Sequence, residues 1–418
     1  MKKLLILAMI FGFYTQLNVS IQAEELPTTI KFPEGLHDPK YLYTPVSVSV
    51  LEGIKPEDKE AIRTILIEYD HLANNFRGPI LNHENPIYHQ NNLFSINEQA
   101  GLNPVVVDEL LYDMIKESLD LYNETEGYFN PALGNVIDAW KEVILSDEYR
   151  SLEIPESVFT ETMSEVNALK DSIDPDKVVL DETQKSVYIS QTGMKLDLGA
   201  FAKGHAAKAI EAYLKSQSYE HYLINIGSST LSLGTLLDDQ GNDRDVAIGL
   251  IDPLGIYEEG NSGTLYLRNK SISTSGNYLQ YALYQGKKYH HIISPFELIP
   301  MDYYHSITLV GDDAATLDGL STALFNMPLD KAKEVLDAFN IAGVFYKIDG
   351  EIETYNLSND MFVLGTKKPV EADVVKQTNT LYFILGGVII IGGAALTGLT
   401  LLEKKKKGQD SHNEEKQE

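Results

Sequence analysis

Two early segments of the chain show the hydrophobic spacing of amphipathic helices. Between Pro56 and Asn75, apolar side chains recur three or four positions apart, at Ile62, Ile65, Leu66 and Tyr69. Between Asp108 and Tyr122 they recur in the same way, at Leu110, Leu111, Met114, Ile115, Leu119 and Leu121. Residues at this spacing lie on one side of an α-helix, so each segment is predicted to be a helix with one buried face. Further helices are predicted over Gly204–Lys215 and Ala314–Phe325.

Short runs of β-branched and aromatic residues predict strands around these helices. The predicted strands are Val46–Leu51, Val187–Ile189, Tyr222–Ile226, Thr230–Gly234, Val246–Ile251, Leu265–Leu267, Ser306–Val310 and Val344–Ile348. Residues 145–185 are acidic and lack β character before Val178. Helices mixed with short strands, without a regular βαβ repeat, indicate an α+β fold.

The first 23 residues have the pattern of a secretory signal peptide. Two lysines precede an apolar stretch over residues 4–13, and Ile21–Gln22–Ala23 fits a cleavage site. The alternative is a retained membrane anchor, although the apolar run is short for a span. Residues 24–40 contain three prolines and are expected to form a flexible leader.

A second hydrophobic stretch lies near the C-terminus. Residues 381–402 are 22 residues without a charge, enough for a helix to cross a ~30 Å hydrocarbon core. Lys404–Lys407 follow directly, and basic residues favour the cytoplasmic side. We therefore expect a linker over 366–380, a transmembrane helix over 381–402 and a cytoplasmic tail over 403–418. A buried core helix is the alternative. The expected location is the cell membrane, with a single span and the main domain extracytoplasmic.

The charge of the main part of the chain is strongly negative. Residues 24–380 hold 27 basic side chains (34 − 2 − 5) and 56 acidic ones (61 − 5), a net charge of −29. Such a surface argues against nucleic acid and anionic lipid as partners. The chain has no cysteine, which excludes disulfides, zinc–thiolate sites, iron–sulfur clusters and thiol nucleophiles.

The segment Asp197–Ala207 (DLGAFAKGHAA) combines a carboxylate, a turn of small residues and a lysine. A strand-like run over Ser186–Leu198 leads into it, and a predicted helix follows. Exposed backbone groups, a helix N-terminus and the Lys203 ammonium together suit a phosphate. Asp197 could orient a sugar hydroxyl or a metal-bound water. Similar strand–Gly–helix junctions also occur in α/β proteins without this chemistry.

Three other segments accompany this one in a recognisable order. They are Thr125–Trp140 (TEGYFNPALGNVIDAW), Ser271–Pro295 (SISTSGNYLQYALYQGKKYHHIISP) and Ile307–Met327 (ITLVGDDAATLDGLSTALFNM). With Asp197–Ala207 they resemble, in order and spacing, the motifs of the ApbE-like family of FAD:protein FMN transferases. The resemblance extends from about Tyr41 to Phe362. It implies that residues 41–365 form one flavin transferase domain.

Asp318 and Thr322 are the predicted metal ligands. They lie four residues apart in a predicted helix, which places a carboxylate and a hydroxyl one turn apart on one face. Hard oxygen ligands suit Mg²⁺. From the pair alone, a surface aspartate and a helix-interior threonine are the alternative interpretation. The family resemblance assigns both residues to Mg²⁺ and implies a third ligand at Ala200, which can offer only its carbonyl oxygen.

The resemblance also implies which residues bind FAD as a substrate and which act on it. The expected FAD-contacting residues are Tyr128, Phe129, Asn130, Asp197, Lys203 and Ile293, the last through its backbone. Core packing is the alternative for Tyr128 and Phe129. His291 matches the family's active-site histidine and could take a proton from an attacking hydroxyl. The adjacent His290 would point the other way in an extended segment. Thr274–Gly276 either lines the nucleotide pocket or forms a turn before a helix.

Several positions depart from the family pattern. Asn130 stands where the family usually has Asp, Ala132 where it has Thr, and Ser294 where it has Asp. Gly227–Ser229 replaces a Gly-Gly-acid segment, and Glu297–Leu298 replaces a Thr-Gly turn. The changes at Asn130 and Ser294 remove two negative charges expected near the cofactor.

Taken with the retained residues, the resemblance implies a Mg²⁺-dependent enzyme that transfers FMN from FAD to a threonine of target proteins and releases AMP. Expected targets are extracytoplasmic electron-transfer proteins with an Asp-Gly-x-(Ser/Thr)-Gly-Ala-Thr segment, which this chain itself lacks. The alternatives are a flavin-binding carrier without activity, an FAD pyrophosphatase, or a structural surface protein on the same scaffold.

Overall fold

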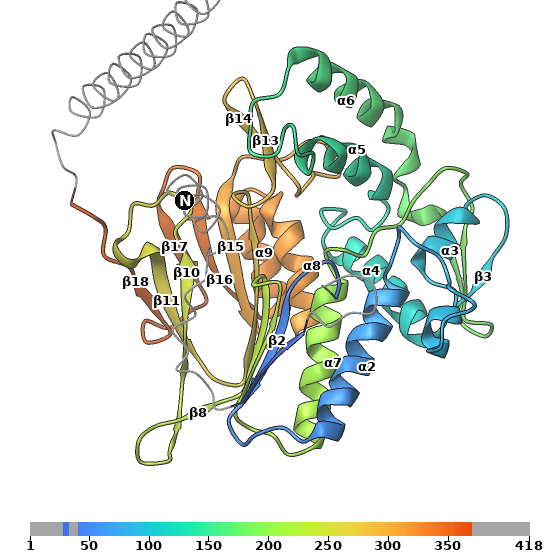
Figure 1. Cartoon of the computed structure of the whole chain (residues 1–418). Helices are drawn as coiled ribbons and strands as arrows, with labels where there is room; N and C mark the ends of the chain where they lie inside the picture. The colour runs from blue at the N-terminus through green and yellow to red at the C-terminus, as the bar shows by residue number, and fades with distance from the viewer. Residues whose placement is uncertain (1–27, 33–40, 370–418) are drawn as a thin grey trace, which may run out of the picture. The chain divides into compact units, whose positions relative to one another are not determined.

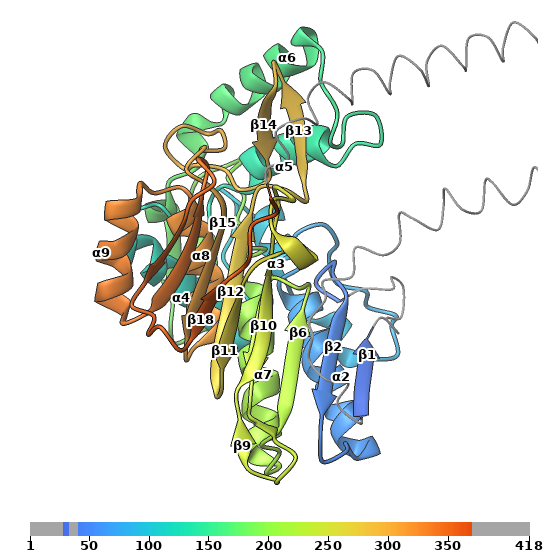
Figure 2. The same cartoon turned by 90° about the vertical axis from the view of Figure 1, so that its left-hand side faces the viewer.

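An eight-stranded antiparallel sheet forms the centre of the molecule (Figures 1 and 2). The computed structural model describes residues 28–32 and 41–369. The strand order is β1–β2–β6–β7–β12–β15–β16–β17. These strands are β1 (Thr28–Phe32), β2 (Val46–Val50), β6 (Tyr222–Ile226), β7 (Thr230–Leu233), β12 (Lys270–Gly276), β15 (Tyr304–Gly311), β16 (Ala342–Lys347) and β17 (Ile352–Tyr355).

A smaller sheet covers one face of the central sheet. It consists of β10 (Val246–Ile251), β11 (Asn261–Leu267) and β18 (Phe362–Leu364). Side chains of both sheets form a buried cluster between them, including Ile248, Leu265, Ile272 and Val310. Because successive residues of a strand point to opposite faces, the neighbours of Ile272 in β12 face the other side of the sheet.

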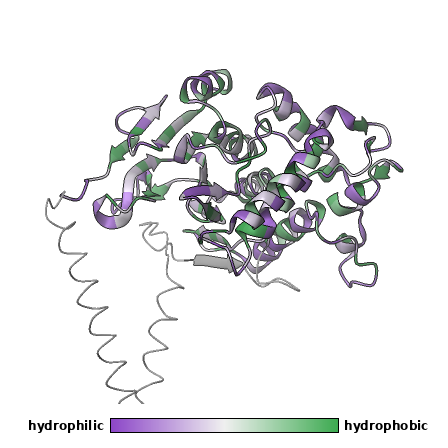
Figure 3. Cartoon of the chain, turned by 90° about the horizontal axis from the view of Figure 1, so that it is seen from above, coloured by the Kyte–Doolittle hydropathy of each residue, from purple (hydrophilic) through white to green (hydrophobic). Residues whose placement is uncertain are grey.

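Helices cover that other face (Figure 1). They are α2 (Pro56–Leu72), α4 (Glu109–Glu124), α7 (Ala202–Ser216), α8 (Ala314–Phe325) and α9 (Leu329–Phe339). Figure 3 shows hydrophobic and hydrophilic positions alternating along single helices, as amphipathic packing on a sheet requires. Helices α7 and α8 approach each other closely at Gly204, where a Cβ atom would lie 2.3 Å from the carbonyl oxygen of Ala314.

A further group of elements packs around its own buried cluster. It contains α5 (Gly134–Ile144), α6 (Glu156–Ala168) and the hairpin of β13 (Tyr281–Tyr284) and β14 (Lys287–His290). The Trp140 ring stacks on Tyr289, and its Nε1 donates to the carbonyl of Leu298 at 2.9 Å. This packing fixes the segment that follows β14.

Short elements complete the described part of the chain. They are α3 (Leu93–Glu98), β3 (Val105–Val106), β4 (Val178–Asp181), β5 (Ser186–Ile189), β8 (Leu236–Leu237), β9 (Asp243–Arg244), and the 3₁₀ helices η1 (Pro86–His89), η2 (Lys170–Ser172), η3 (Pro175–Lys177) and η4 (Glu258–Gly260).

The mixed helix–strand architecture confirms the predicted fold class, whereas one local prediction was wrong and one of two open alternatives is excluded. The strand-like run over Ser186–Leu198 ends as a strand at Ile189. Thr274–Gly276 is not a turn before a helix but the end of the central strand β12. None of the helices within residues 28–32 and 41–369 is both long and apolar enough to span a membrane. The predicted signal peptide, the leader apart from 28–32, the transmembrane helix and the tail lie outside the described residues.

Candidate active site

The Asp197 carboxylate organises the loop between β5 and α7. One oxygen accepts the Gly199 N–H at 2.6 Å, and the other accepts the side-chain amide of Asn75 at 2.8 Å. The backbone N–H of Asp197 donates to the Pro131 carbonyl at 2.9 Å, which ties this loop to residues 128–131. Burial would raise the pKa of Asp197, but the Lys141 ammonium at 3.6 Å and these hydrogen bonds hold the pKa below its ordinary value.

Lys203, in the first turn of α7, connects this loop to Asp318 on α8. Its Nζ donates to the Gly199 carbonyl at 2.9 Å and lies 3.5 Å from Oδ2 of Asp318. The N–H of Gly204 donates to the same carboxylate oxygen at 2.9 Å. The close approach of the two helices at Gly204 therefore brings the predicted phosphate-binding lysine and the predicted metal ligand together.

Hydroxyl groups of the sheet hold the other oxygen of Asp318. Thr230 of β7 donates to Oδ1 at 3.2 Å, and Ser273 of β12 donates to it at 3.4 Å. Ser321 of α8 shares hydrogen bonds with Ser273 at 3.2 Å and with Ser275 at 2.9 Å. A buried carboxylate needs such partners, and they fix its orientation. The sequence analysis missed these hydroxyl groups around Asp318. The serines at every second position of β12 could have indicated them.

The predicted metal ligands supply oxygen donors only. Thr322 follows Asp318 by one turn of α8. Ala200 lies two residues before the start of α7, with its side chain packed against a buried cluster. Within the described residues, no group of three or more His, Cys, Asp or Glu side chains is arranged to hold a metal ion. One carboxylate, one hydroxyl and one carbonyl fit the chemistry of Mg²⁺, which takes few protein ligands beside phosphate oxygens and water.

His291 lies directly after β14 and is partly buried. Its Nδ1 is buried and has no hydrogen-bond partner among the described residues. Burial lowers the pKa of His291 to about 4; the Gln280 carbonyl opposes the shift, and the positive charges of Lys203 and Lys141 add to it. The imidazole is therefore neutral near pH 7 and can accept a proton.

His290 has different surroundings from its neighbour. It is 0 % exposed, and its ring meets Phe325 edge-on at 5.4 Å between centroids. Its Nε2 lies 3.2 Å from the Met301 carbonyl, and its Nδ1 accepts the Ile292 N–H at 3.3 Å. These contacts give His290 a structural role.

The three residues of the predicted flavin-side segment are placed differently. Tyr128 is partly buried and meets the half-exposed Phe296 edge-on at 4.8 Å. Phe129 is 3 % exposed and packs with Phe201 in a buried cluster, so its side chain is part of the core. Asn130 borders a pocket of about 420 Å³. The pocket is lined by Tyr122, Glu126, Gly127, Asn130, Lys170, Asp171, Ile173, Asp174, Pro295 and Phe296.

Ile293 can offer its backbone but not its side chain, which is 4 % exposed and packs in the core. Its carbonyl accepts the side-chain amide of Asn326 at 3.4 Å. The same amide donates to the Thr322 carbonyl at 3.2 Å. Asn326 therefore connects the His291 segment to the metal-ligand helix.

Three residues beside Asp197 were missed by sequence reasoning: Asn75, Phe76 and Lys141. The Phe76 side chain is 50 % exposed, and the Lys141 Nζ lies 5.4 Å from its ring centroid. Asn75 and Phe76 are more than a hundred residues from Asp197 along the chain. Nothing in the local pattern around either residue indicates this proximity.

Comparisons with known proteins identify the family of this chain. The model of the ApbE family matches residues 43–345. The chain belongs to the ApbE family. An FAD:protein FMN transferase of Klebsiella pneumoniae is 30 % identical over 243 residues, which cover 58 % of this chain and 70 % of that relative. One of Treponema pallidum is 29 % identical over 270 residues, covering 59 % and 68 %.

Solved ApbE structures share the fold. The ApbE protein of Thermotoga maritima superposes with a TM-score of 0.61 at 24 % identity, covering 78 % of this chain and 96 % of that one. The flavin transferase ApbE of Vibrio cholerae gives a TM-score of 0.60 at 20 % identity with the same coverages. The predicted family and the predicted transferase class are thus confirmed.

The departures from the ApbE pattern have local structural roles. Oδ1 of Asn130 accepts the Ala132 N–H at 2.8 Å, and its Nδ2 donates to the Ile173 carbonyl at 3.0 Å. The Ser294 hydroxyl oxygen accepts the N–H groups of Phe296 and Glu297, each at 3.3 Å. Both side chains supply the acceptor that a turn at these positions needs.

Proposed function

We propose that this chain transfers FMN from FAD to a threonine hydroxyl of a target protein and releases AMP. The observation that carries the proposal is that Gly199 links Asp197 to Lys203, that Lys203 pairs with Asp318, and that the buried Nδ1 of His291 has no partner among the described residues. The curated relatives are FAD:protein FMN transferases, which supports the same reaction here.

The residues of the site can perform such a transfer. The threonine oxygen attacks the phosphorus of the FMN half, the bond from that phosphorus to the AMP oxygen breaks, and AMP leaves. Nδ1 of His291 takes the proton of the attacking hydroxyl. The Lys203 ammonium offsets the negative charge of the diphosphate. Phe76 offers an exposed aromatic surface beside Asp197 on which a ring of FAD can stack.

We further propose that Asp318, Thr322 and the Ala200 carbonyl hold Mg²⁺. A bound Mg²⁺ would neutralise phosphate charge at the point where the leaving group develops it. The hydroxyls of Thr230 and Ser273 would then act as positioning groups, because they hold the carboxylate that the metal needs.

The test uses the purified full chain, FAD, MgCl₂ and an acceptor protein carrying an Asp-Gly-x-(Ser/Thr)-Gly-Ala-Thr segment. Release of AMP together with an acceptor that gains the mass of FMN supports transfer. AMP with free FMN identifies a pyrophosphatase, and bound FAD without AMP identifies a carrier. Asp318→Asn should abolish transfer and weaken Mg²⁺ binding measured by calorimetry.

The same proposal includes the extracytoplasmic side of the cell membrane as the place of the reaction. It is supported by the signal-like residues 1–23 and by the apolar residues 381–402 followed by four lysines.

A further inference from the structure

Lys141 is a second ammonium group at the candidate site. It lies in the last turn of α5, and its side chain is 30 % exposed. Its Nζ is 3.6 Å from Oδ2 of Asp197 and 5.4 Å from the ring centroid of Phe76. Lys141 lies one residue beyond the Thr125–Trp140 segment.

Three lysines around this site differ in how closely an acidic side chain pairs with their positive charge. Lys195 is neutralised by a direct ion pair with Asp138 at 2.5 Å. Lys203 donates to the Gly199 carbonyl at 2.9 Å and is 3.5 Å from Asp318. Lys141 has its ion pair with Asp197 at the longer distance of 3.6 Å.

Asp197 already has close partners of its own. It accepts hydrogen bonds from the Gly199 N–H and from Asn75. An ammonium has three donors, so Lys141 can keep this ion pair and still bind another anion. Lys203 donates to the carbonyl of Gly199, and the N–H of Gly199 donates to Asp197, so both ammonium groups lie at the Asp197 loop. The positive charges of both lysines also lower the pKa of His291.

We propose that Lys141 is a second anion-binding residue of this site, which together with Lys203 holds the diphosphate of FAD. The proposal rests on the proposed function, because it takes FAD as the ligand. The chain carries a formal net charge of −27, which repels an anionic dinucleotide from most of the surface. Two ammonium groups at the Asp197 loop counteract that repulsion where we propose that the phosphates lie.

Lys141→Met tests this directly, with Lys195→Met as the matched control. FAD binding in MgCl₂ is followed by the change in flavin fluorescence at several salt concentrations. Lys141→Met should weaken FAD binding about 10-fold, as expected for a lost hydrogen bond to a charged group. It should also make the affinity less sensitive to salt, because one screened charge pair is gone. Lys141→Arg should retain most of the wild-type affinity for FAD and most of its salt dependence.

The control separates this role from a general effect of charge. Lys195→Met removes the same charge from beside the same Phe76 ring, 5.2 Å from its centroid, but from a lysine already paired with Asp138. It should leave affinity and salt dependence unchanged. Unchanged affinity in Lys141→Met, a loss with unaltered salt dependence, or an equal loss in Lys195→Met would each overturn the proposal.

The pH dependence of kcat/KM is a second measurement, which a purely structural role of Lys141 would not change. The Lys141 charge lowers the pKa of His291, so Lys141→Met should move the acidic limb of kcat/KM to higher pH. FAD binding can be measured whether or not transfer occurs, so the two proposals can fail separately. If the unmodified chain binds FAD but releases no AMP, the proposed function is wrong. If the Lys141→Met variant binds FAD as tightly as the wild-type chain, this inference is wrong.

Discussion

At the scale of single residues, two neutral side chains stand where the family pattern has acids, and their hydrogen bonds explain how the fold tolerates them. Asn130 and Ser294 each accept backbone N–H groups of the turn that follows. An aspartate could make the same contacts, but only Asn130 also donates, to the Ile173 carbonyl. The two positions are therefore not equivalent.

This difference gives a prediction for the two acidic variants. Ser294→Asp keeps the acceptor, but Ser294 is 2 % exposed, so the desolvation of a carboxylate there should lower the free energy of unfolding. Asn130→Asp loses the donor to Ile173 and should lower the free energy of unfolding by about 1 kcal/mol. Urea denaturation of both variants measures this. An Asn130→Asp variant as stable as the wild-type chain would show that the Asn130–Ile173 hydrogen bond contributes little.

The two adjacent histidines should respond differently to the same substitution. His291→Asn should lower turnover roughly 10²–10⁴-fold with FAD affinity nearly kept, because it removes the proton acceptor. His290→Asn should instead lower stability, since His290 is fully buried and holds the Met301 carbonyl and the Ile292 N–H. Transfer assays and thermal unfolding of both variants separate the two effects.

The pH profile follows from the environment of His291. Its pKa is lowered to about 4, so kcat/KM should be level through neutral pH and fall only as the pH drops toward 4. An acidic limb near the ordinary histidine value of about 6.5 would indicate that another group limits the reaction.

Motif reasoning could select Lys203, Asp318 and His291 as candidates, because each lies in a short segment of distinctive composition. It could not identify Phe76 or Lys141, since only the folded chain brings them beside Asp197. It assigned Phe129 to the flavin from its neighbours in sequence, whereas burial places that side chain in the core.

At the scale of elements, the predictions succeeded where hydrophobic spacing was strong. Helix α8 and strand β10 occupy the predicted residues, and α2 begins at the predicted Pro56. Strand β12 was missed because Ser and Gly have low strand propensity. Its place between β7 and β15 in the central sheet prevails over that propensity, and its Ser273 donates a hydrogen bond to Asp318.

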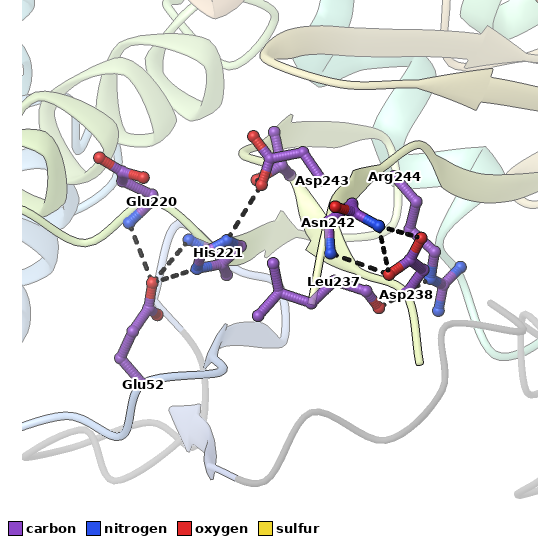
Figure 4. Close-up of polar contacts among 9 residues, drawn as sticks. Glu52, Glu220, His221, Leu237, Asp238, Asn242, Asp243 and Arg244 are labelled. Carbon is purple, nitrogen blue, oxygen red and sulfur yellow. Dashed lines mark hydrogen bonds and ion pairs between the residues drawn. The ribbon is translucent and has the colours of Figure 1, made fainter. Parts of the chain in front are cut away.

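His221 lies between two carboxylates and connects the short hairpin of β8 and β9 to the end of β2 (Figure 4). Nδ1 of His221 contacts Glu52, which follows β2, and Nε2 lies 3.4 Å from Asp243 of β9. Glu52 also accepts the backbone N–H groups of Glu220 and His221, at 3.3 and 3.1 Å. Burial lowers the pKa of His221, but the two carboxylates outweigh it and hold the pKa above its ordinary value.

This cluster should make stability depend on pH in a defined direction. A base whose pKa is raised on folding stabilises the fold while protonated. The contribution is complete below the unfolded pKa of about 6.5 and is lost as the pH rises through the higher folded pKa. Urea denaturation should therefore show a larger difference between wild type and His221→Gln at pH 5.5 than at pH 9.

At the scale of the whole molecule, the described part of the chain contains a complete set of candidate site residues within one body. Contacts divide the chain into Met1–Thr366 and Lys367–Glu418, and each proposed site residue belongs to the first unit. The site unites the loop before α7, α8 and the segment after β14, so it depends on the whole of this fold rather than on one motif.

The C-terminal residues predict on which side of the membrane the unit Met1–Thr366 lies. Residues 381–402 are uncharged and long enough to span, and the four lysines after them favour the cytoplasm for residues 403–418. The acidic part of the chain would then be outside, where a soluble protease can reach it. Protease added to intact protoplasts should remove the domain and leave a small fragment that an antibody against residues 408–418 detects. Deleting residues 381–418 should release the domain into the medium. A domain that stays protected until the protoplasts are lysed would place it in the cytoplasm and contradict the proposed topology.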